Sequence, residues 1–213
     1  MILLQVLIGH SEEKRCKKMK NATGCFGSDV LARSIRSHKT QLEYTPTMYG
    51  LPKIHKPDMP LRPILSSVGS FSYDCAKWLS DSLSELRHHE TCVKDTLLFL
   101  SLLQDRSSSG KITTTFDVTS LFTNVPVNFT INLILDSVFR RSDEFNDLNR
   151  RRMKKLLEWV VKTTTFQFNG RFYRQVDGVA MGSPIAPLME QLLQTSSVQA
   201  VELVTPAKNR IEN

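Results

Sequence analysis

A chain of 213 residues that is 40% hydrophobic, with only 9 Gly and 9 Pro, is long enough to bury a core and too apolar to be disordered. Its net charge of +7 fits a polyanionic partner such as nucleic acid, although many basic proteins only carry solvated basic faces. No stretch reaches the ~20 apolar residues of a membrane helix, and the four cysteines form no CxxC pair. We therefore expect reduced thiols and an intracellular protein, nuclear or cytoplasmic, without a membrane partner.

The first part of the chain is a mixed-charge segment followed by a proline-rich one. Residues 1–45 show no pattern beyond a charge run that is typical of a solvated helix face. Five prolines then fall within Pro46–Pro63, which excludes regular helix and predicts an extended, turn-rich segment. Its cations could neutralise a triphosphate or be solvated charges on a loop. These cations are Lys53, Lys56 and Arg62.

Two helices and a strand are predicted next. Residues 73–89 form a helix with a buried stripe, because apolar residues recur every three or four positions. A second, apolar helix is predicted over 93–103. The hydrophobic period then changes to two over 112–118, which predicts a strand. The stripe of the first helix consists of Cys75, Leu79, Leu83 and Leu86.

Asp117, at the end of that strand, is the candidate catalytic residue and metal ligand. Nucleotidyl transfer uses two hard cations, and Mg²⁺ prefers carboxylates on rigid elements such as a strand end. The alternative is an ordinary aspartate in a strand-to-loop turn. Five residues later, Phe122 could lie under the sugar of an incoming nucleotide, or it could be an aromatic residue of the core.

Two more helices are predicted after Pro126, which suits the first turn of a helix. The core face of the first would contain Ile131, Leu135, Val138 and Phe139. The second covers 148–162 and buries Met153, Leu156, Leu157, Val160 and Val161. Its other face carries cations that could follow a nucleic-acid backbone or be solvated. These are Arg150, Arg151, Arg152, Lys154 and Lys155.

A hairpin and a segment of small residues complete the pattern. Asn169-Gly170 tolerates the positive φ angles of a type I′ turn, so strands are predicted over 165–168 and 171–174. The small residues of 178–187 would let another backbone or a nucleic acid approach closely. Ser183 is a poor hydrolase nucleophile because its neighbours do not form the Gly-x-Ser-x-Gly elbow. Together these elements predict an α+β fold with an antiparallel sheet.

These segments resemble the reverse transcriptase domain of Penelope-like retroelements over about residues 49–187. The fingers motifs are matched by Tyr49-Gly50-Leu51-Pro52-Lys53-Ile54-His55-Lys56 and Leu61-Arg62-Pro63-Ile64. The first palm motif is matched by Phe116-Asp117-Val118-Thr119-Ser120-Leu121-Phe122-Thr123-Asn124-Val125-Pro126. The second is matched by Phe168-Asn169-Gly170-Arg171-Phe172-Tyr173 and Asp177-Gly178-Val179-Ala180-Met181-Gly182-Ser183-Pro184. More distantly, the arrangement is similar to telomerase.

The resemblance implies RNA-templated DNA synthesis by a right hand of fingers, palm and thumb, with an RNA template, a DNA primer, deoxynucleoside triphosphates and Mg²⁺. It implies that Asp117 binds the metal and that Phe122 is the sugar gate. Lys53 and Arg62 would face the triphosphate. The template and nucleotide pocket would be shaped by Gly182 and Ser183. Independently of the resemblance, their charge predicts that four cations contact the nucleic acid: Lys56, Arg151, Arg152 and Lys155.

The chain departs from this family after the Gly-Ser-Pro segment. The family continues into a helix, then a hairpin with an aromatic-x-Asp-Asp turn and then a thumb, whereas this sequence has no Asp-Asp pair and no Asp after Asp177. We therefore expect a partial right hand with packed helices, a short antiparallel sheet and no thumb. Its parts would be an N-terminal extension (1–45), a fingers-like segment (46–110), a partial palm (111–187) and a divergent tail (188–213).

The expected function is that of a truncated RNA-directed DNA polymerase domain, inactive alone because the Asp-Asp motif is missing. The alternative is a non-catalytic nucleic-acid-binding protein that retains the polymerase scaffold. A third possibility is a degenerate product of a retroelement that folds poorly.

Overall fold

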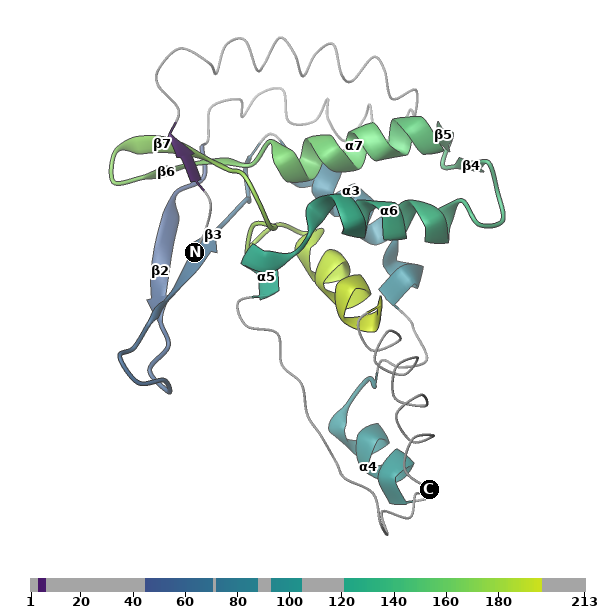
Figure 1. Ribbon diagram of the computed structural model, residues 1–213, viewed down its shortest axis with the longest axis horizontal. Coiled ribbons are helices and arrows are strands. Elements are labelled where there is room, and N and C mark those ends of the chain that lie inside the picture. Colours follow the sequence, from purple (N-terminus) through teal and green to yellow (C-terminus); the bar gives the residue numbers. More distant parts are fainter. Residues whose placement is uncertain (1–3, 7–44, 71, 88–92, 105–120, 197–213) are drawn as a thin grey trace, which may run out of the picture.

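The computed structural model describes residues 4–6, 45–70, 72–87, 93–104 and 121–196 as a mixture of helices and short antiparallel strands (Figure 1). The predicted α+β class is therefore confirmed for this part of the chain. Its elements are β1 (Leu4–Val6), β2 (Met48–Pro52), β3 (Leu61–Leu65), α3 (Tyr73–Ser82), the 3₁₀ turn η1 (Ser84–Arg87), α4 (Thr96–Gln104), α5 (Leu121–Asn124), α6 (Val127–Val138), β4 (Glu144–Phe145), β5 (Leu148–Asn149), α7 (Arg150–Lys162), β6 (Thr165–Phe168) and β7 (Arg171–Gln175).

The predicted Asn-Gly hairpin is formed by β6 and β7, to which β1 adds a third antiparallel strand. Both turn residues have the positive φ that a type I′ turn requires, 48° at Asn169 and 72° at Gly170. The backbone N–H of Gln167 donates to the carbonyl oxygen of Pro46 over 2.8 Å. This bond joins the sheet to the start of the proline-rich segment.

The proline-rich segment is a second hairpin, in which β2 pairs antiparallel with β3. Its prolines fit because a two-stranded hairpin has free edges, where a residue without an N–H loses no ladder bond. A bond of 3.0 Å from the N–H of Lys53 to the carbonyl oxygen of Pro60 closes the hairpin before its turn. The segment is thus extended, as predicted.

The main core lies where α3, α6 and α7 meet the segment 179–193, and it includes all five side chains predicted to be buried in α7. The predicted stripe of α3 is also confirmed, with Cys75, Leu79 and Leu83 at most 1% exposed. On α6, Ile131 and Leu135 are buried as predicted, whereas Val138 and Phe139 are half-buried at the margin of this core.

Some predicted boundaries shift for local reasons. The helix predicted over 73–89 ends at Ser82 and continues as the 3₁₀ turn η1. The helix predicted from residue 148 begins at Arg150, because β5 pairs with β4 and the Asn149 side chain accepts a 3.0 Å hydrogen bond from the N–H of Arg152. Asparagine is a favoured N-cap for this reason. The strand predicted over 112–118 lies outside the described residues.

The segment expected to be a divergent tail is in part an element of the core. Residues 186–196 are helical, and Leu188 and Met189 are fully buried. The helix forms because apolar residues recur at helical spacing and are buried in the main core, to which α3, α6 and α7 also contribute. Within the described ranges, no helix is long and apolar enough to cross a bilayer.

Candidate functional site

Three segments that are distant in the sequence meet at one place, which we call the three-segment junction (residues 65–67, 121–123 and 178–183). The N–H of Leu65 donates to the carbonyl oxygen of Met181 over 3.0 Å. The hydroxyl group of Ser67 donates to the carbonyl oxygen of Gly182 over 2.8 Å. From the other side, the N–H of Val179 donates to the carbonyl oxygen of Phe122 over 2.8 Å.

Two glycines make this close approach possible. Gly182 has a φ of 126°, and a Cβ atom there would lie 2.3 Å from the carbonyl oxygen of Leu65. Gly178 has a φ of 71°, and its Cβ would lie 2.6 Å from the carbonyl oxygens of Phe122 and Thr123. Such distances exclude any side chain. The small residues predicted to admit a backbone or a nucleic acid therefore admit a backbone at these two positions.

The cations of the β2–β3 hairpin lie on the strand and turn that lead to the junction. Arg62 is exposed on β3, three residues before Leu65, and pairs with Leu51 across the hairpin. Lys53 is half-buried at the end of β2, and Lys56 is exposed in the turn. In Figure 1 this hairpin projects from the rest of the molecule. Its charges are therefore accessible to an anionic partner.

Phe122 and Ser183 both belong to the junction. Phe122 is half-buried in α5 and packs against the main core, as expected if it is an aromatic residue of the core. Ser183 is half-buried, its N–H donates to Ala180, and its carbonyl oxygen accepts from the N–H of Ala186. Ser183 thus starts the helix 186–196. Asp117 lies outside the described residues.

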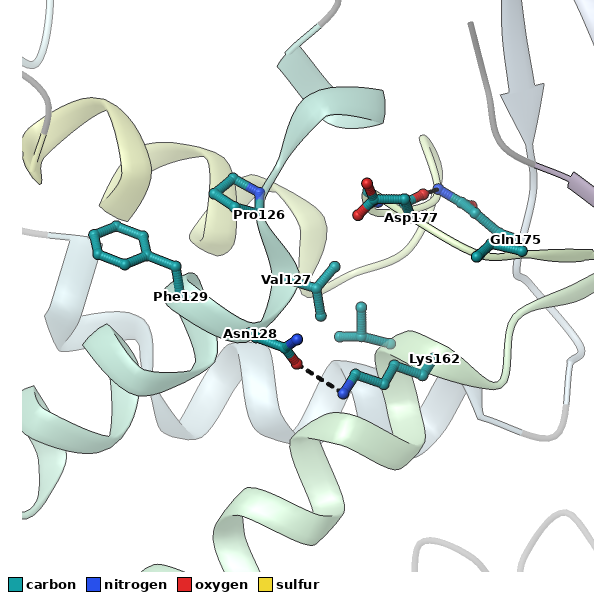
Figure 2. Close-up of a pocket in the computed structure, with 10 residues that line it drawn as sticks. Pro126, Val127, Asn128, Phe129, Lys162, Gln175 and Asp177 are labelled. Carbon is teal, nitrogen blue, oxygen red and sulfur yellow. Dashed lines mark hydrogen bonds between the residues drawn. The ribbon is translucent and has the colours of Figure 1, made fainter.

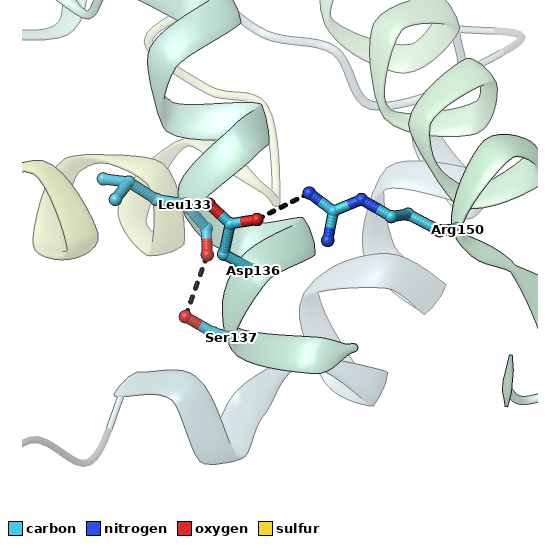
Figure 3. Close-up of polar contacts among 4 residues, drawn as sticks. All are labelled: Leu133, Asp136, Ser137 and Arg150. Carbon is cyan, nitrogen blue, oxygen red and sulfur yellow. Dashed lines mark hydrogen bonds and ion pairs between the residues drawn. The ribbon is translucent and has the colours of Figure 1, made fainter. Parts of the chain in front are cut away.

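The basic row of α7 lies away from the junction. Arg151, Arg152 and Lys155 are exposed in the first half of the helix, next to β4 and β5. Figure 1 places this end of α7 on the opposite side of the molecule from β3 and α5. Arg150 is partly neutralised, because it forms an ion pair of 2.5 Å with Asp136 of α6 (Figure 3). The structure therefore does not bring this row together with Arg62.

A cavity of about 400 Å³ lies beside the junction, between the start of α6, the end of α7 and residues 175–178 (Figure 2). The Lys162 ammonium group donates to the side-chain oxygen of Asn128 over 2.8 Å and contacts Glu158 at 3.4 Å. Gln175 donates to the backbone carbonyl oxygen of Asp177 over 2.9 Å. The lining of the cavity thus includes one cation, Lys162, and one carboxylate, Asp177.

The sequence patterns did not identify Asn128 and Lys162 as residues of a site. The two residues are 34 positions apart, and the sequence around each one is typical of a solvated helix position. The one available signal is Asp177, the first residue of the segment Asp177–Pro184 that resembles part of the second palm motif. Its Oδ1 accepts from the N–H of Gly178 over 2.9 Å, which holds the carboxyl group close to the turn at Gly178.

The described residues do not by themselves form a metal centre. Among them, no three His, Cys, Asp or Glu side chains gather in a way that could hold a metal ion. The predicted ligand, Asp117, is not among the described residues. The Mg²⁺ site therefore stays a prediction.

A comparison with models of known families finds none that matches this chain, and a comparison with curated proteins finds no match either. The likeness to Penelope-like reverse transcriptases therefore rests on the sequence motifs alone.

Proposed function

We propose that this chain is the fingers and partial palm of a reverse transcriptase similar to those of Penelope-like retroelements, a template-directed nucleotidyl transferase. The observation that carries the proposal is the three-segment junction. It joins the fingers-like hairpin, the end of the first palm motif and the Gly-Ser-Pro segment through backbone contacts. A polymerase site needs such an arrangement, because the groups that bind the nucleotide come from separate parts of the chain and must be held rigidly.

In this proposal each cation and small residue has a distinct role. Arg62 and Lys53 contact the triphosphate, since a guanidinium group binds two phosphate oxygens at once and an ammonium group acts as a point charge. Phe122 limits the space at the sugar. Gly182 and Ser183 shape the pocket for the nucleotide and template, because a bulkier residue at 182 would displace β3.

Asp117 is the metal ligand in the proposal, and it stands four residues before α5 in the sequence. Mg²⁺ would neutralise charge on the phosphate oxygens and is ordinarily held by one or two carboxylates together with the substrate. Since the sequence contains no Asp-Asp pair, the chain alone is expected to bind nucleotide and template more readily than to extend a primer.

The decisive test measures binding of a labelled deoxynucleoside triphosphate in the presence of Mg²⁺. We expect Arg62→Ala and Asp117→Ala each to weaken binding at least about tenfold, because each removes a charge-assisted contact of about 1.5 kcal/mol or more. Arg141→Ala is the matched control, since Arg141 is exposed in the loop after α6. A loss in Arg141→Ala as large as that in Arg62→Ala would indicate non-specific attraction and contradict the proposal.

Primer extension on an RNA template provides a second, independent readout. Any incorporation by the wild-type chain should require Mg²⁺ and disappear in Asp117→Ala. Incorporation that persists in this variant would reject the role given to Asp117, whatever the binding assay shows.

A second candidate function is nucleic-acid binding without catalysis, and the basic row of α7 favours it. Cations in the first turn of a helix oppose the macrodipole, so Arg151 and Arg152 do not stabilise α7. Their placement is better explained by an external anion, such as a phosphate backbone.

The salt dependence of affinity tests this second function. For an RNA–DNA duplex, the combined variant with alanine at Arg151, Arg152 and Lys155 should reduce the slope of log affinity against log salt by about 2 to 3, because each phosphate contact contributes close to 0.9. Lys77→Ala, which removes an exposed cation of α3, should leave the slope nearly unchanged. A slope that is flat in the wild-type chain would exclude the row as a binding surface.

A further inference from the structure

Two β-hairpins of the chain turn in the same way, each with asparagine as the first residue of the turn. The β6–β7 hairpin turns at Asn169-Gly170 and the β4–β5 hairpin at Asn146-Asp147, and the flanking residues pair in both, so each loop has two residues. Both asparagines have a φ of 48°, and the residues after them have φ angles of 72° and 60°. All four residues are exposed. The turns therefore differ mainly in the residue that follows asparagine.

That following residue controls a reaction of the asparagine side chain. Its backbone nitrogen can attack the side-chain carbonyl carbon (Cγ) of asparagine, which closes a five-membered succinimide ring and releases ammonia. The attack requires a backbone N–H that is not held by an acceptor and a path that no Cβ atom crowds. In a two-residue turn the residue after the turn donates the hydrogen bond, so the N–H of the second turn residue has no partner within the turn.

Gly170 meets both conditions. Its N–H donates to no acceptor among the residues that the structure describes. No atom lies within 4 Å of the position that a Cβ would take. Because glycine has no side chain, the peptide unit after Asn169 can rotate towards ring closure at low steric cost. Asn169-Gly170 is also the only Asn-Gly pair in the sequence.

We propose that Asn169 is a site of spontaneous deamidation in the folded protein. The new bond joins the nitrogen of Gly170 to Cγ of Asn169, and the bond that breaks releases the side-chain nitrogen as ammonia, which takes the proton of the Gly170 N–H. Water then opens the ring at either of its carbonyl groups and leaves aspartate or isoaspartate at position 169. No atom is oxidised or reduced, and water is the only co-reactant. The proposal is independent of the function proposed above.

The products differ in what they do to the β6–β7 hairpin. Both add a carboxylate next to Arg171 and lower the positive net charge of the chain. Isoaspartate also lengthens the backbone of the turn by a methylene group, so the two-residue type I′ geometry is lost. The change falls at the turn end of the hairpin, beyond the residues Tyr173–Gln175 that pair with β1. We therefore expect the product chains to keep the three-stranded sheet and to lose the pairing of Phe168 with Arg171 in the isoaspartate form.

Incubation of the folded chain at pH 8, followed by peptide mass spectrometry, compares the two turns in one sample. We expect Asn169 to be converted at least about tenfold faster than Asn146, because a side chain on the following residue hinders the attack. Synthetic peptides with aspartate or isoaspartate at position 169 identify the products by their chromatographic retention. Equal or slower conversion at Asn169 overturns the proposal. Conversion that occurs only after unfolding in urea also overturns it, because the folded turn would then protect the side chain.

Exchanging the following residues tests the cause. Gly170→Asp should slow the conversion of Asn169 at least about tenfold, and Asp147→Gly should accelerate that of Asn146 by a similar factor. Aspartate tolerates a positive φ, as Asp147 shows, so both variants should retain the wild-type circular dichroism spectrum. A Gly170→Asp chain that is deamidated at Asn169 as fast as the wild type contradicts the mechanism.

Discussion

The hydroxyl group of Ser67 donates a 2.8 Å hydrogen bond to the carbonyl oxygen of Gly182, 115 residues further along the chain. Two residues earlier, the N–H of Leu65 bonds to the carbonyl oxygen of Met181. These bonds attach the end of β3 to the segment that leads into the core helix 186–196. The orientation of Arg62 on β3 therefore depends on the conformation of the Gly-Ser-Pro segment.

Replacing Gly182 by alanine should disrupt this attachment. The new Cβ would lie 2.3 Å from the carbonyl oxygen of Leu65, and the φ of 126° is unfavourable for any L residue. We expect a loss of about 2–4 kcal/mol in the free energy of unfolding, because backbone strain of 1–3 kcal/mol adds to the steric clash. Urea denaturation followed by circular dichroism measures this loss.

Gly170→Ala is the matched control for that experiment. Gly170 also has a positive φ, 72°, but no atom lies within 4 Å of the Cβ that would be added. The substitution should lower the free energy of unfolding by only about 1 kcal/mol, because only the backbone conformation is unfavourable. Equal losses at the two positions would show that the clash with Leu65 contributes nothing.

The parts of the fold that the sequence predicted are those with local causes. The buried stripe of α7 follows from a helical repeat of apolar residues, and the β6–β7 turn follows from Asn169-Gly170. In both cases the signal spans fewer than about twenty residues and no distant contact competes with it. The helix 186–196 had a similar repeat, at Leu188, Met189, Leu192 and Leu193, which the departure from the family pattern obscured.

The candidate site was less predictable because distant contacts create it. Nothing in the neighbourhood of Gly182 indicates that Leu65 will face it, and nothing near Asn128 indicates Lys162. The motifs predicted that three segments have related roles, but not that they meet through backbone hydrogen bonds. The expectation that the basic row of α7 contacts nucleic acid rests on charge alone, and charge does not specify which side of the molecule a helix face occupies.

A core substitution in α6 should be far more damaging than an exposed one. Leu135 is 1% exposed in the main core, so Leu135→Ala should lower the free energy of unfolding by about 2–5 kcal/mol through lost contacts and a residual cavity. Asn132→Ala, on the exposed side of the same helix, should change it by less than about 0.5 kcal/mol. Thermal denaturation of the two variants and the wild-type chain measures both changes in stability. A broad, non-cooperative transition in the wild-type chain would contradict the existence of this packed core.

The cap of α7 should be measurable on its own. Removing the Asn149 side chain deprives the N–H of Arg152 of its acceptor, and we expect Asn149→Ala to destabilise the protein by about 1 kcal/mol. Asn149→Asp should retain most of the stability, because a carboxylate accepts the same bond and interacts favourably with the helix dipole. A loss in the aspartate variant as large as that in the alanine variant would indicate that the cap is not formed in solution.

Cys75 should be inert towards alkylation in the folded protein. Burial, together with the neighbouring Asp74 carboxylate, raises the pKa of the Cys75 thiol to about 12. Only the thiolate reacts, so iodoacetamide at pH 8 should modify Cys75 at least about a hundredfold more slowly in the native chain than in urea. Peptide mass spectrometry measures both rates. Similar rates would contradict the burial of this side chain.

The same pKa shift makes stability fall at alkaline pH. The folded state favours the neutral thiol, so this contribution is fully present below about 8.5, the pKa of an exposed thiol, and is lost as the pH rises towards 12. The free energy of unfolding should therefore decrease over this window, and less steeply in Cys75→Ala, which has no thiol to ionise. Although the alanine variant will be less stable at pH 7 because it leaves a small cavity, the test is the difference between the two slopes. Parallel slopes would mean that Cys75 titrates alike in the folded and unfolded chains.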